Sequence, residues 1–270
     1  MKPIKTFRDL LAFLTIIPVG KTDDFVVTSA EAIFLFPVIG GFIGLLGAAY
    51  FVGCGFLISY VIAFINSIIQ IPVEFLLKLA PAVMTLAFLL VLTGLQHFDG
   101  LVDLGNAIGL GNVKERRAAA HAWTVSHKGA FLAIFVEFLA VLGLFLVNAE
   151  FAFGAIVAAE VAAKIGMVTI VWLGKPTHTG LGSIFLETAK KRRNILAYVL
   201  SVLIVCPLFG FTSFGLILSF GVILVSVLSG FFMESVGTRI FGGVSGDMIG
   251  ATNETVRAVA LVFVAGALML

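Results

Sequence analysis

Seven long apolar runs, each long enough to cross a lipid bilayer, constrain this chain more than any other feature of its sequence. They cover roughly residues 33–56, 79–96, 130–148, 151–173, 195–211, 213–233 and 256–270. A membrane-spanning helix needs about 20 mostly apolar residues. Only 12% of the 270 residues are charged, whereas about 25% are charged in a soluble domain. The sequence therefore predicts an all-α, polytopic transmembrane helical bundle that forms one integral membrane domain over residues 1–270.

Two segments leave the number of spans open between six and eight. Apolar character continues through residues 57–71, which are compatible with an eighth span, a re-entrant segment or an interfacial helix. Residues 1–20 combine basic residues with a short apolar run that ends at Pro18. Because no small-residue cleavage pattern of a signal peptide follows, we expect an amphipathic helix at the membrane surface there.

The basic residues predict the orientation of the bundle. Fifteen of the seventeen lysines and arginines lie in four segments, residues 2–21, 114–128, 175–193 and 239–257. With seven spans, all four segments fall on one side, which the positive-inside rule makes cytoplasmic. We therefore expect a multi-pass protein of the cell membrane, in contact with lipid, whose N-terminus and active-site loops are cytoplasmic. The basic residues form no stripe with aromatics, so nucleic acid is not an expected partner, and a homo-oligomer stays open.

The polar segment "TGLQHFDGLVDLGNAIG", residues 93–109, follows the second apolar run. It carries His97, Asp99, Asp103 and Asn106. If a helix continues through it, Asp99, Asp103 and Asn106 are spaced i, i+4 and i+7 and share one face. Carboxylates on one face repel each other unless a cation lies between them, and Mg²⁺ commonly binds one or two carboxylates, water and substrate phosphates. The alternative is the solvated end of a membrane helix.

A second polar segment, "FGGVSGDMIGATNE" at residues 241–254, precedes the last predicted span. It places Ser245 and Asp247 among four glycines, and Asn253 and Glu254 where the span begins. A glycine-rich turn before a helix can present backbone N–H groups to phosphate. Glycines also serve as packing contacts between membrane helices. On the same side as Asp99 and Asp103, this segment is a candidate for the other half of one site.

Ionisable residues also occur inside the predicted spans. Glu160 and Lys164 are spaced i, i+4, and Glu137 lies in the preceding span. Such groups are costly in lipid and usually face a bundle interior or a cavity. Either Glu160 and Lys164 neutralise each other, or Lys164 faces a substrate phosphate. Lys175 and His178, in the loop after this span, are further candidates to contact an anionic substrate.

Four segments together resemble the cobalamin synthase family, whose activity is adenosylcobinamide-GDP ribazoletransferase. "FLTIIPVG" (13–20) is similar to the family's Phe-Leu-Thr-x-x-Pro, and "FPVIGGFIGLLGA" (36–48) to its Phe-Pro-x-x-Gly-x-x-x-Gly span. Residues 93–109 resemble its His-x-Asp-Gly-Leu-x-Asp segment, and "GGVSGDMIGATNE" (242–254) its Gly-Gly-x-x-Gly-Asp-x-x-Gly-Ala stretch. The four segments occur in the family's order, so the resemblance covers most of the chain.

The resemblance implies a Mg²⁺-dependent enzyme that joins adenosylcobinamide-GDP to α-ribazole or its 5′-phosphate and releases GMP. It makes Asp99, Asp103 and Asp247 the expected catalytic residues. The expected metal ligands are the same three carboxylates with Asn106, and the expected substrate contacts are His97, Lys164, Lys175, Ser245, Asn253 and Glu254. The alternatives are a related membrane phosphotransferase that uses another nucleotide-diphosphate donor, and a non-catalytic, transporter-like protein.

Three positions depart from the family pattern. Asn106 stands where the family has a further Asp, and Lys164 stands where an Arg is expected. The family's Lys-Asp-Ser-x-x-Gly stretch is "TVSHKG" here, with Val125 in place of the Asp. Asparagine retains a carbonyl ligand and lysine retains the positive charge, whereas valine can act neither as a ligand nor as a base.

Overall fold

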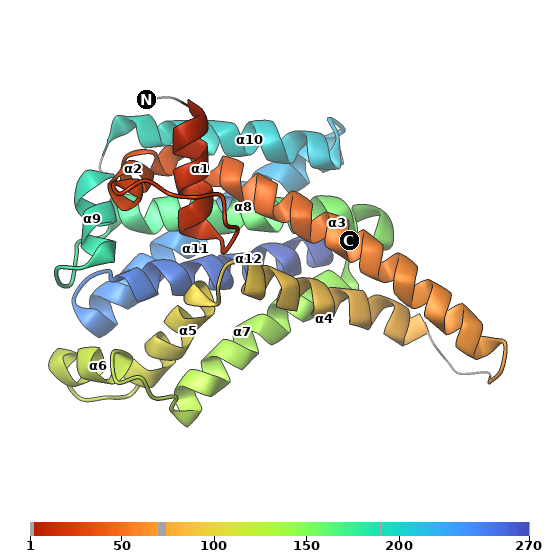
Figure 1. The fold of residues 1–270 in the computed structure, drawn as a ribbon, viewed down its shortest axis with the longest axis horizontal. Helices are drawn as coiled ribbons and strands as arrows, with labels where there is room; N and C mark the ends of the chain where they lie inside the picture. Colours follow the sequence, from red (N-terminus) through yellow and green to blue (C-terminus); the bar gives the residue numbers. More distant parts are fainter. Residues whose placement is uncertain (1–2, 70–73, 190, 270) are drawn as a thin grey trace.

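The computed structural model describes residues 3–69, 74–189 and 191–269, and within them the chain is helical, without a β-strand (Figure 1). The first half contains α1 (Pro3–Leu14), α2 (Phe25–Glu31), the 3₁₀ turn η1 (Ile33–Leu35), α3 (Phe36–Asn66), α4 (Glu74–Leu92), α5 (Gln96–Ala107) and α6 (Val113–Ala120). The second half contains α7 (His127–Leu146), α8 (Ala149–Leu173), α9 (Leu181–Thr188), η2 (Arg192–Asn194), α10 (Ile195–Phe209), α11 (Ser213–Phe241) and α12 (Gly246–Leu268).

Seven helices of the described chain are long and apolar enough to cross a membrane, which confirms the prediction of about seven spans. They are α3, α4, α7, α8, α10, α11 and α12. Residues 57–66 continue helix α3, so this part of the 57–71 segment belongs to the first span. The end of that segment, like Met1, Lys2, Lys190 and Leu270, lies outside the described residues.

Two of the helix boundaries that differ from the predicted ones lie at the polar segments. Gly94 and Leu95 have φ values of 70° and 58°, so the chain leaves α4 and starts the separate helix α5 instead of continuing the span to residue 96. At the other segment, α12 begins at Gly246 and not near residue 256. The Ser245 hydroxyl accepts a hydrogen bond from Met248 N at 3.3 Å, a helix-starting contact that satisfies one of the free N–H groups of the first turn.

Helices α8 and α12 form the centre of the bundle. Every residue of α8 from 154 to 171 is buried. The glycines of α3 permit the closest approach to α8. A side-chain carbon on Gly40 would lie 2.6 Å from the Glu160 carbonyl oxygen, and one on Gly44 would lie 2.7 Å from the Val157 Cα. Small residues at a helix interface let membrane helices pack backbone to backbone, which accounts for the glycine spacing of residues 36–48.

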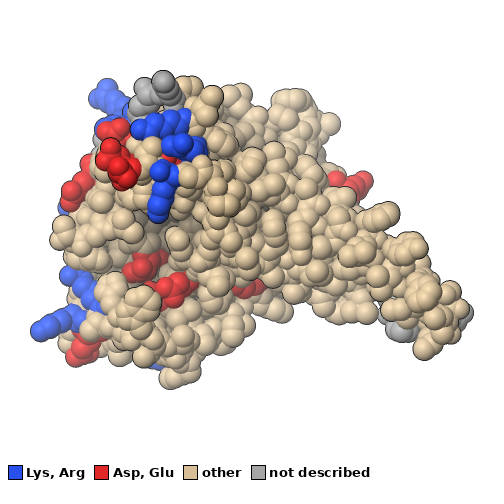
Figure 2. All heavy atoms as spheres, viewed as in Figure 1, with Lys and Arg blue, Asp and Glu red and all other residues tan. Residues whose placement is uncertain are grey.

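One end of the bundle carries most of the charge. Helices α3, α7, α10 and α12 begin there, and α4, α8 and α11 end there (Figure 1). Figure 2 shows Lys, Arg, Asp and Glu side chains gathered at this end, while most of the visible remainder is uncharged. We call it the polar end. The amphipathic helix expected within residues 1–20 is α1, which lies at this end.

Candidate active site at the crossing of α5 and α12

Glycines bring the two polar segments into contact at the polar end. A side-chain carbon on Gly100 of α5 would overlap the carbonyl oxygen of Asp247 in α12. Likewise, a carbon on Gly250 would lie 3.1 Å from the Cα of His97. Only glycine allows so close a crossing of two backbones. The crossing therefore places Asp99 and Asp103, on either side of Gly100 in sequence, against the first turn of α12.

The three aspartates face a shared hollow, which we call the acidic chamber. It has a volume of about 320 Å³ and is lined by Asp99, Val102, Asp103, Ala120, His121, Trp123, Thr124, Val125 and Asp247. Among the described residues that line it there is no lysine or arginine, and His121 is the one side chain with a basic nitrogen. A bound cation would stabilise three carboxylates gathered in this way.

The pKa of Asp103 reflects the closeness of the three aspartates. Burial, together with the negative charges of Asp247 and Asp99, raises the pKa of Asp103 to about 7. Among the described residues, however, no three His, Cys, Asp or Glu side chains converge tightly enough to hold a metal ion by themselves. A cation in the acidic chamber would therefore need further oxygen ligands from water or substrate, which is the usual coordination of Mg²⁺.

A second, largely apolar hollow lies beside the first, and we call it the apolar chamber. It has a volume of about 300 Å³. Its lining consists of Phe13, Phe36, Gln96, His97, His121, Met167, His178, Leu181, Gly182, Phe185, Gly246, Asp247, Ile249 and Gly250. Asp247 and His121 line both chambers, so the two hollows meet at these side chains.

Asn106, predicted to be a metal ligand, bonds to the loop between α6 and α7. Its side-chain nitrogen donates to the Thr124 carbonyl oxygen at 2.8 Å, and its side-chain oxygen accepts from Ser126 N at 2.9 Å. It thereby fastens the loop between α6 and α7 to α5 and does not line the acidic chamber. Val125, in the same loop, does line the chamber and is 68% exposed. The position at which the family pattern has a carboxylate thus faces the three aspartates.

Ser245 and Lys175, both predicted to contact substrate, help to shape the start of α12. The Ser245 hydroxyl caps the helix and donates to Asp247 Oδ2 at 3.3 Å. The Lys175 carbonyl oxygen accepts from Val244 N at 2.7 Å, which joins the loop after α8 to the loop before α12. The Lys175 side chain is exposed and lines neither chamber.

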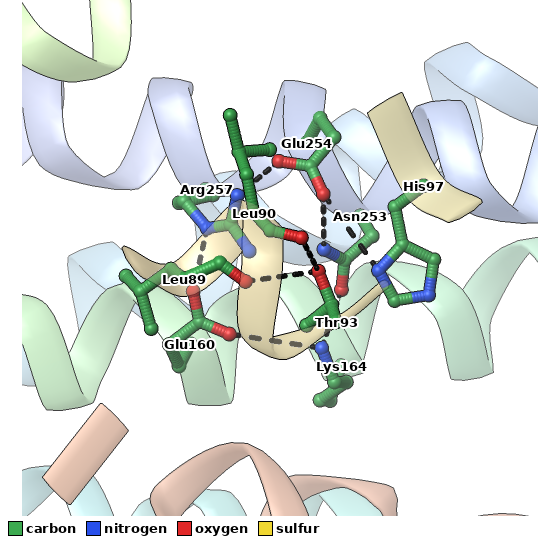
Figure 3. A network of polar contacts seen from close by, with 9 residues as sticks. All are labelled: Leu89, Leu90, Thr93, His97, Glu160, Lys164, Asn253, Glu254 and Arg257. Carbon is green, nitrogen blue, oxygen red and sulfur yellow. Dashed lines mark hydrogen bonds and ion pairs between the residues drawn. The ribbon is translucent and has the colours of Figure 1, made fainter. Parts of the chain in front are cut away.

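Beneath the chambers, side chains of α8 and α12 form a buried ionic network (Figure 3). Arg257 Nε lies 2.5 Å from Glu160 Oε1, and the same guanidinium binds Glu254. Lys164 Nζ lies 3.7 Å from Glu160 Oε2 and donates to Asn253 Oδ1 at 2.6 Å. Asn253 in turn donates to Glu254 Oε1 at 3.0 Å. The network thus pairs the charges of the two central helices with one another.

Three of the residues predicted to contact substrate lie in this network. Lys164, Asn253 and Glu254 are buried and line neither chamber, so they do not meet substrate at these surfaces. Glu160 and Lys164 interact with each other, as in the self-neutralising alternative, but Arg257 is an additional partner. The placement of Arg257 beside a loop at the cytoplasmic face is wrong, because the early start of α12 puts it inside the helix, where it is 1% exposed.

His97 connects the network to the apolar chamber. It lines that chamber, is 7% exposed, and has its Nδ1 3.7 Å from Glu254 Oε1 (Figure 3). Burial, and to a lesser degree the positive charges of Lys164 and Arg257, lowers the pKa of His97 well below its ordinary value. The imidazole is therefore neutral at neutral pH and can donate or accept a hydrogen bond at the chamber wall.

His178, a sequence-based candidate for contact with an anionic substrate, lines the apolar chamber. There its ring meets that of His121, which the sequence analysis does not predict for the site, with centroids 5.4 Å apart. Phe13, Phe36 and Phe185 line it as well. Phe13 and Phe36 begin two of the segments that resemble the family, whereas Phe185 reads in sequence as an ordinary apolar residue. For the buried network, the sequence signal for Arg257 is its position three residues after Glu254, a spacing that favours an ion pair on a helix.

Comparison with known proteins identifies the family. Residues 6–265 match the family model described as cobalamin-5-phosphate synthase. The adenosylcobinamide-GDP ribazoletransferase of Methanocella arvoryzae is 30% identical, and the alignment covers 94% of this chain and 92% of that protein. The protein of the same name from Halorubrum lacusprofundi is 30% identical, with 96% and 95% covered. That from Pyrococcus abyssi is 31% identical, with 74% and 83% covered.

No solved structure matches the chain. The family model nevertheless covers almost the whole sequence, including both polar segments that meet at the crossing of α5 and α12. This chain belongs to the cobalamin-5-phosphate synthase family.

Proposed function

We propose that this protein transfers the adenosylcobinamide phosphate moiety from adenosylcobinamide-GDP to α-ribazole, or to its 5′-phosphate, in a late step of cobalamin biosynthesis. The products are GMP and adenosylcobalamin, or adenosylcobalamin phosphate. Family membership and the names of the relatives support this activity. The structural observation that carries it is the acidic chamber, whose described lining contains three carboxylates and neither lysine nor arginine.

The reaction exchanges one phosphorus–oxygen bond for another. A ribosyl hydroxyl oxygen of the acceptor attacks the phosphorus that bears the cobinamide, and the bond from that phosphorus to GMP breaks. The hydroxyl proton passes to a base, and GMP leaves with the bridging oxygen. Such a phosphoryl transfer depends mainly on positioning and on stabilisation of the developing negative charge.

Asp99 and Asp103 are the proposed ligands of Mg²⁺, because both line the acidic chamber on one face of α5. When bound, Mg²⁺ would neutralise charge on the diphosphate and on the leaving GMP. Asp247 is either a further ligand or the base that accepts the hydroxyl proton. Asn106 is left out of this set, because its side-chain amide is used to hold the loop of residues 124–126.

The polar end is proposed to face the cytoplasm. Seven spans put the basic loops on one side, and lysine and arginine favour the cytoplasmic side of a membrane. A charged donor and a nucleoside acceptor would then reach the chambers from the cytoplasm, while the apolar flanks of the bundle contact lipid. The buried ion pairs of Glu160 and Lys164 argue against the transporter-like alternative, because these charges bind each other and line neither chamber.

Substitution of the three aspartates tests the proposal. The variants Asp99→Asn, Asp103→Asn and Asp247→Asn keep the side-chain size and remove the charge. Membranes containing each variant would be assayed for GMP release from adenosylcobinamide-GDP with α-ribazole and Mg²⁺. We expect activity to fall by roughly 100-fold or more. Asp23→Asn is the matched control, because Asp23 is an exposed aspartate that lines neither chamber. Wild-type activity in Asp99→Asn would contradict the proposal.

A further inference from the structure

The apolar chamber is built as a pocket for a flat ring. The rings of Phe13 and Phe185 are stacked with centroids 4.8 Å apart, and the Phe36 ring lies 6.0 Å from that of Phe185. These rings come from α1, α9 and α3, and Met167, Leu181 and Ile249 add aliphatic and thioether surface from three helices. A volume of about 300 Å³ is within the range of pockets that bind small molecules.

Backbone contacts between glycines close one side of this pocket. A side-chain carbon on Gly182 would lie 2.5 Å from the backbone nitrogen of Gly246, so α9 touches the start of α12 through backbone alone. The same glycines line the chamber. The wall made by α9 is therefore held directly beside Asp247, the residue at which the two chambers meet.

Few polar side chains are available inside the pocket. Apart from Asp247, these are Gln96 and three histidines, and His97 among them is buried. Guanine presents polar atoms around most of its edge, and each of them would need a partner once buried. A corrinoid macrocycle is much larger than the chamber. An uncharged, mostly apolar heteroaromatic ring with one or two hydrogen-bonding nitrogens matches the lining better than either.

We infer that the apolar chamber binds the benzimidazole base of the acceptor α-ribazole, with its ribosyl group directed toward Asp247 and the acidic chamber. The inference rests on the proposed function, which supplies the identity of the acceptor. In this arrangement, each part of the two substrates has its own place in the site. The base lies among the phenylalanines, the donor diphosphate lies among the aspartates, and the attacking hydroxyl lies at the junction that Asp247 and His121 share.

Binding of α-ribazole alone, without donor or Mg²⁺, tests this inference directly. Equilibrium dialysis against detergent-purified protein would compare wild type with two variants. Leu181→Glu places a charge at the chamber mouth, where Leu181 is 62% exposed and substitution spares the core. Phe185→Leu removes the stacked ring and keeps an apolar side chain. Val113→Glu is the control, because Val113 is an exposed apolar residue on α6 that lines neither chamber.

We expect Leu181→Glu to weaken α-ribazole binding by about tenfold or more, and Phe185→Leu to weaken it as well. In turnover assays, the KM for α-ribazole should rise by a similar factor, while the KM for adenosylcobinamide-GDP stays within about twofold of wild type. Benzimidazole should compete with α-ribazole for binding, whereas GMP should not.

Three outcomes would overturn the inference, and they are distinct from failure of the proposed function. Unchanged α-ribazole binding in both variants would show that the base lies elsewhere. Displacement by GMP, or a selective rise in the donor KM, would assign the chamber to the guanosine. If wild-type protein binds α-ribazole through Leu181 and Phe185 but releases no GMP from the donor, the transfer activity fails while the chamber assignment stands.

Discussion

Arg257 Nε and Glu160 Oε1 lie 2.5 Å apart in the centre of the bundle, where the two side chains are 1% and 0% exposed. This pair joins α12 to α8, the two most buried of the seven candidate spans. Two carboxylates, Glu160 and Glu254, and two cations, Lys164 and Arg257, interact in this region. Because the charges balance, the loss of either cation leaves a buried negative charge without compensation.

Arg257→Met should destabilise the protein strongly. Removing one partner of a buried ion pair typically costs about 3–5 kcal/mol, because the remaining charge stays buried. Thermal unfolding in detergent would measure the effect. Arg239→Met is the control, since Arg239 is an exposed arginine at the end of α11. If the two variants unfolded at the same temperature, the network would not hold α8 and α12 together.

Gly100→Ala tests the helix crossing itself. The added carbon would overlap the Asp247 carbonyl oxygen, so α5 and α12 must move apart and carry the aspartates with them. A displacement of about 1 Å can reduce catalysis by about 100-fold, which GMP release would reveal. Gly53→Ala is a matched control, because a carbon added there in α3 meets nothing within 4 Å. Equal activity in the two alanine variants would show that close approach at Gly100 is not required.

The acidic chamber predicts how stability depends on pH in Mg²⁺-free buffer. The pKa of Asp103 is about 7 in the folded protein, raised by burial and by Asp247 and Asp99, whereas an unfolded aspartate has a pKa of about 4. Between these values the unfolded chain has released a proton that the folded protein still holds. This carboxyl group therefore destabilises the fold increasingly as pH rises from about 4 to about 7.

The variant Asp103→Asn should lack this pH-dependent destabilisation, because it has no carboxyl group at position 103. Tm would be measured for wild type and for Asp103→Asn at several pH values from about 4 to about 7. We expect the Tm of the variant to rise relative to that of wild type as pH increases. Asp23→Asn, at an exposed aspartate, should track the wild-type curve. A difference curve for Asp103→Asn that stays flat would contradict the raised pKa.

Val125 and Asn106, the two positions where a carboxylate is missing, should respond in opposite ways. Val125→Asp adds a carboxylate to the lining of the acidic chamber and should lower the Mg²⁺ concentration for half-maximal activity by about fivefold. Asn106→Asp instead loses the donor to the Thr124 carbonyl oxygen. It should lower stability by about 1–3 kcal/mol without improving the Mg²⁺ requirement. A lower Mg²⁺ requirement in Asn106→Asp would restore Asn106 as a metal ligand.

The sequence predicts the membrane helices well because hydrocarbon length sets how many consecutive apolar residues each needs. The apolar runs yield all seven spans of the described chain. The helix ends are harder to predict where a span contains paired charges. The sequence predicts that the last span begins near Asn253 and Glu254, yet α12 begins at Gly246 and these residues lie well inside it. Asn253 and Arg257 have partners on α8, and Glu254 is paired with Arg257, so the polar groups are satisfied within the bundle.

The aspartates of the site are recognisable in sequence, whereas the walls around them are not. Asp99 and Asp103 share a helical face at a spacing of four residues, and Asp247 follows a helix-capping serine. The apolar chamber combines one residue each from α1, α3 and α8 with three from α9. Their convergence depends on tertiary contacts such as Gly182 against Gly246, which no local pattern in the sequence predicts.

The most direct test is product formation by the purified wild-type protein in liposomes. With adenosylcobinamide-GDP, α-ribazole and Mg²⁺, we predict that GMP and adenosylcobalamin form in equal amounts, and that a chelator stops both. GMP formed without adenosylcobalamin, or no turnover by folded protein that still binds α-ribazole, would contradict the proposed transfer.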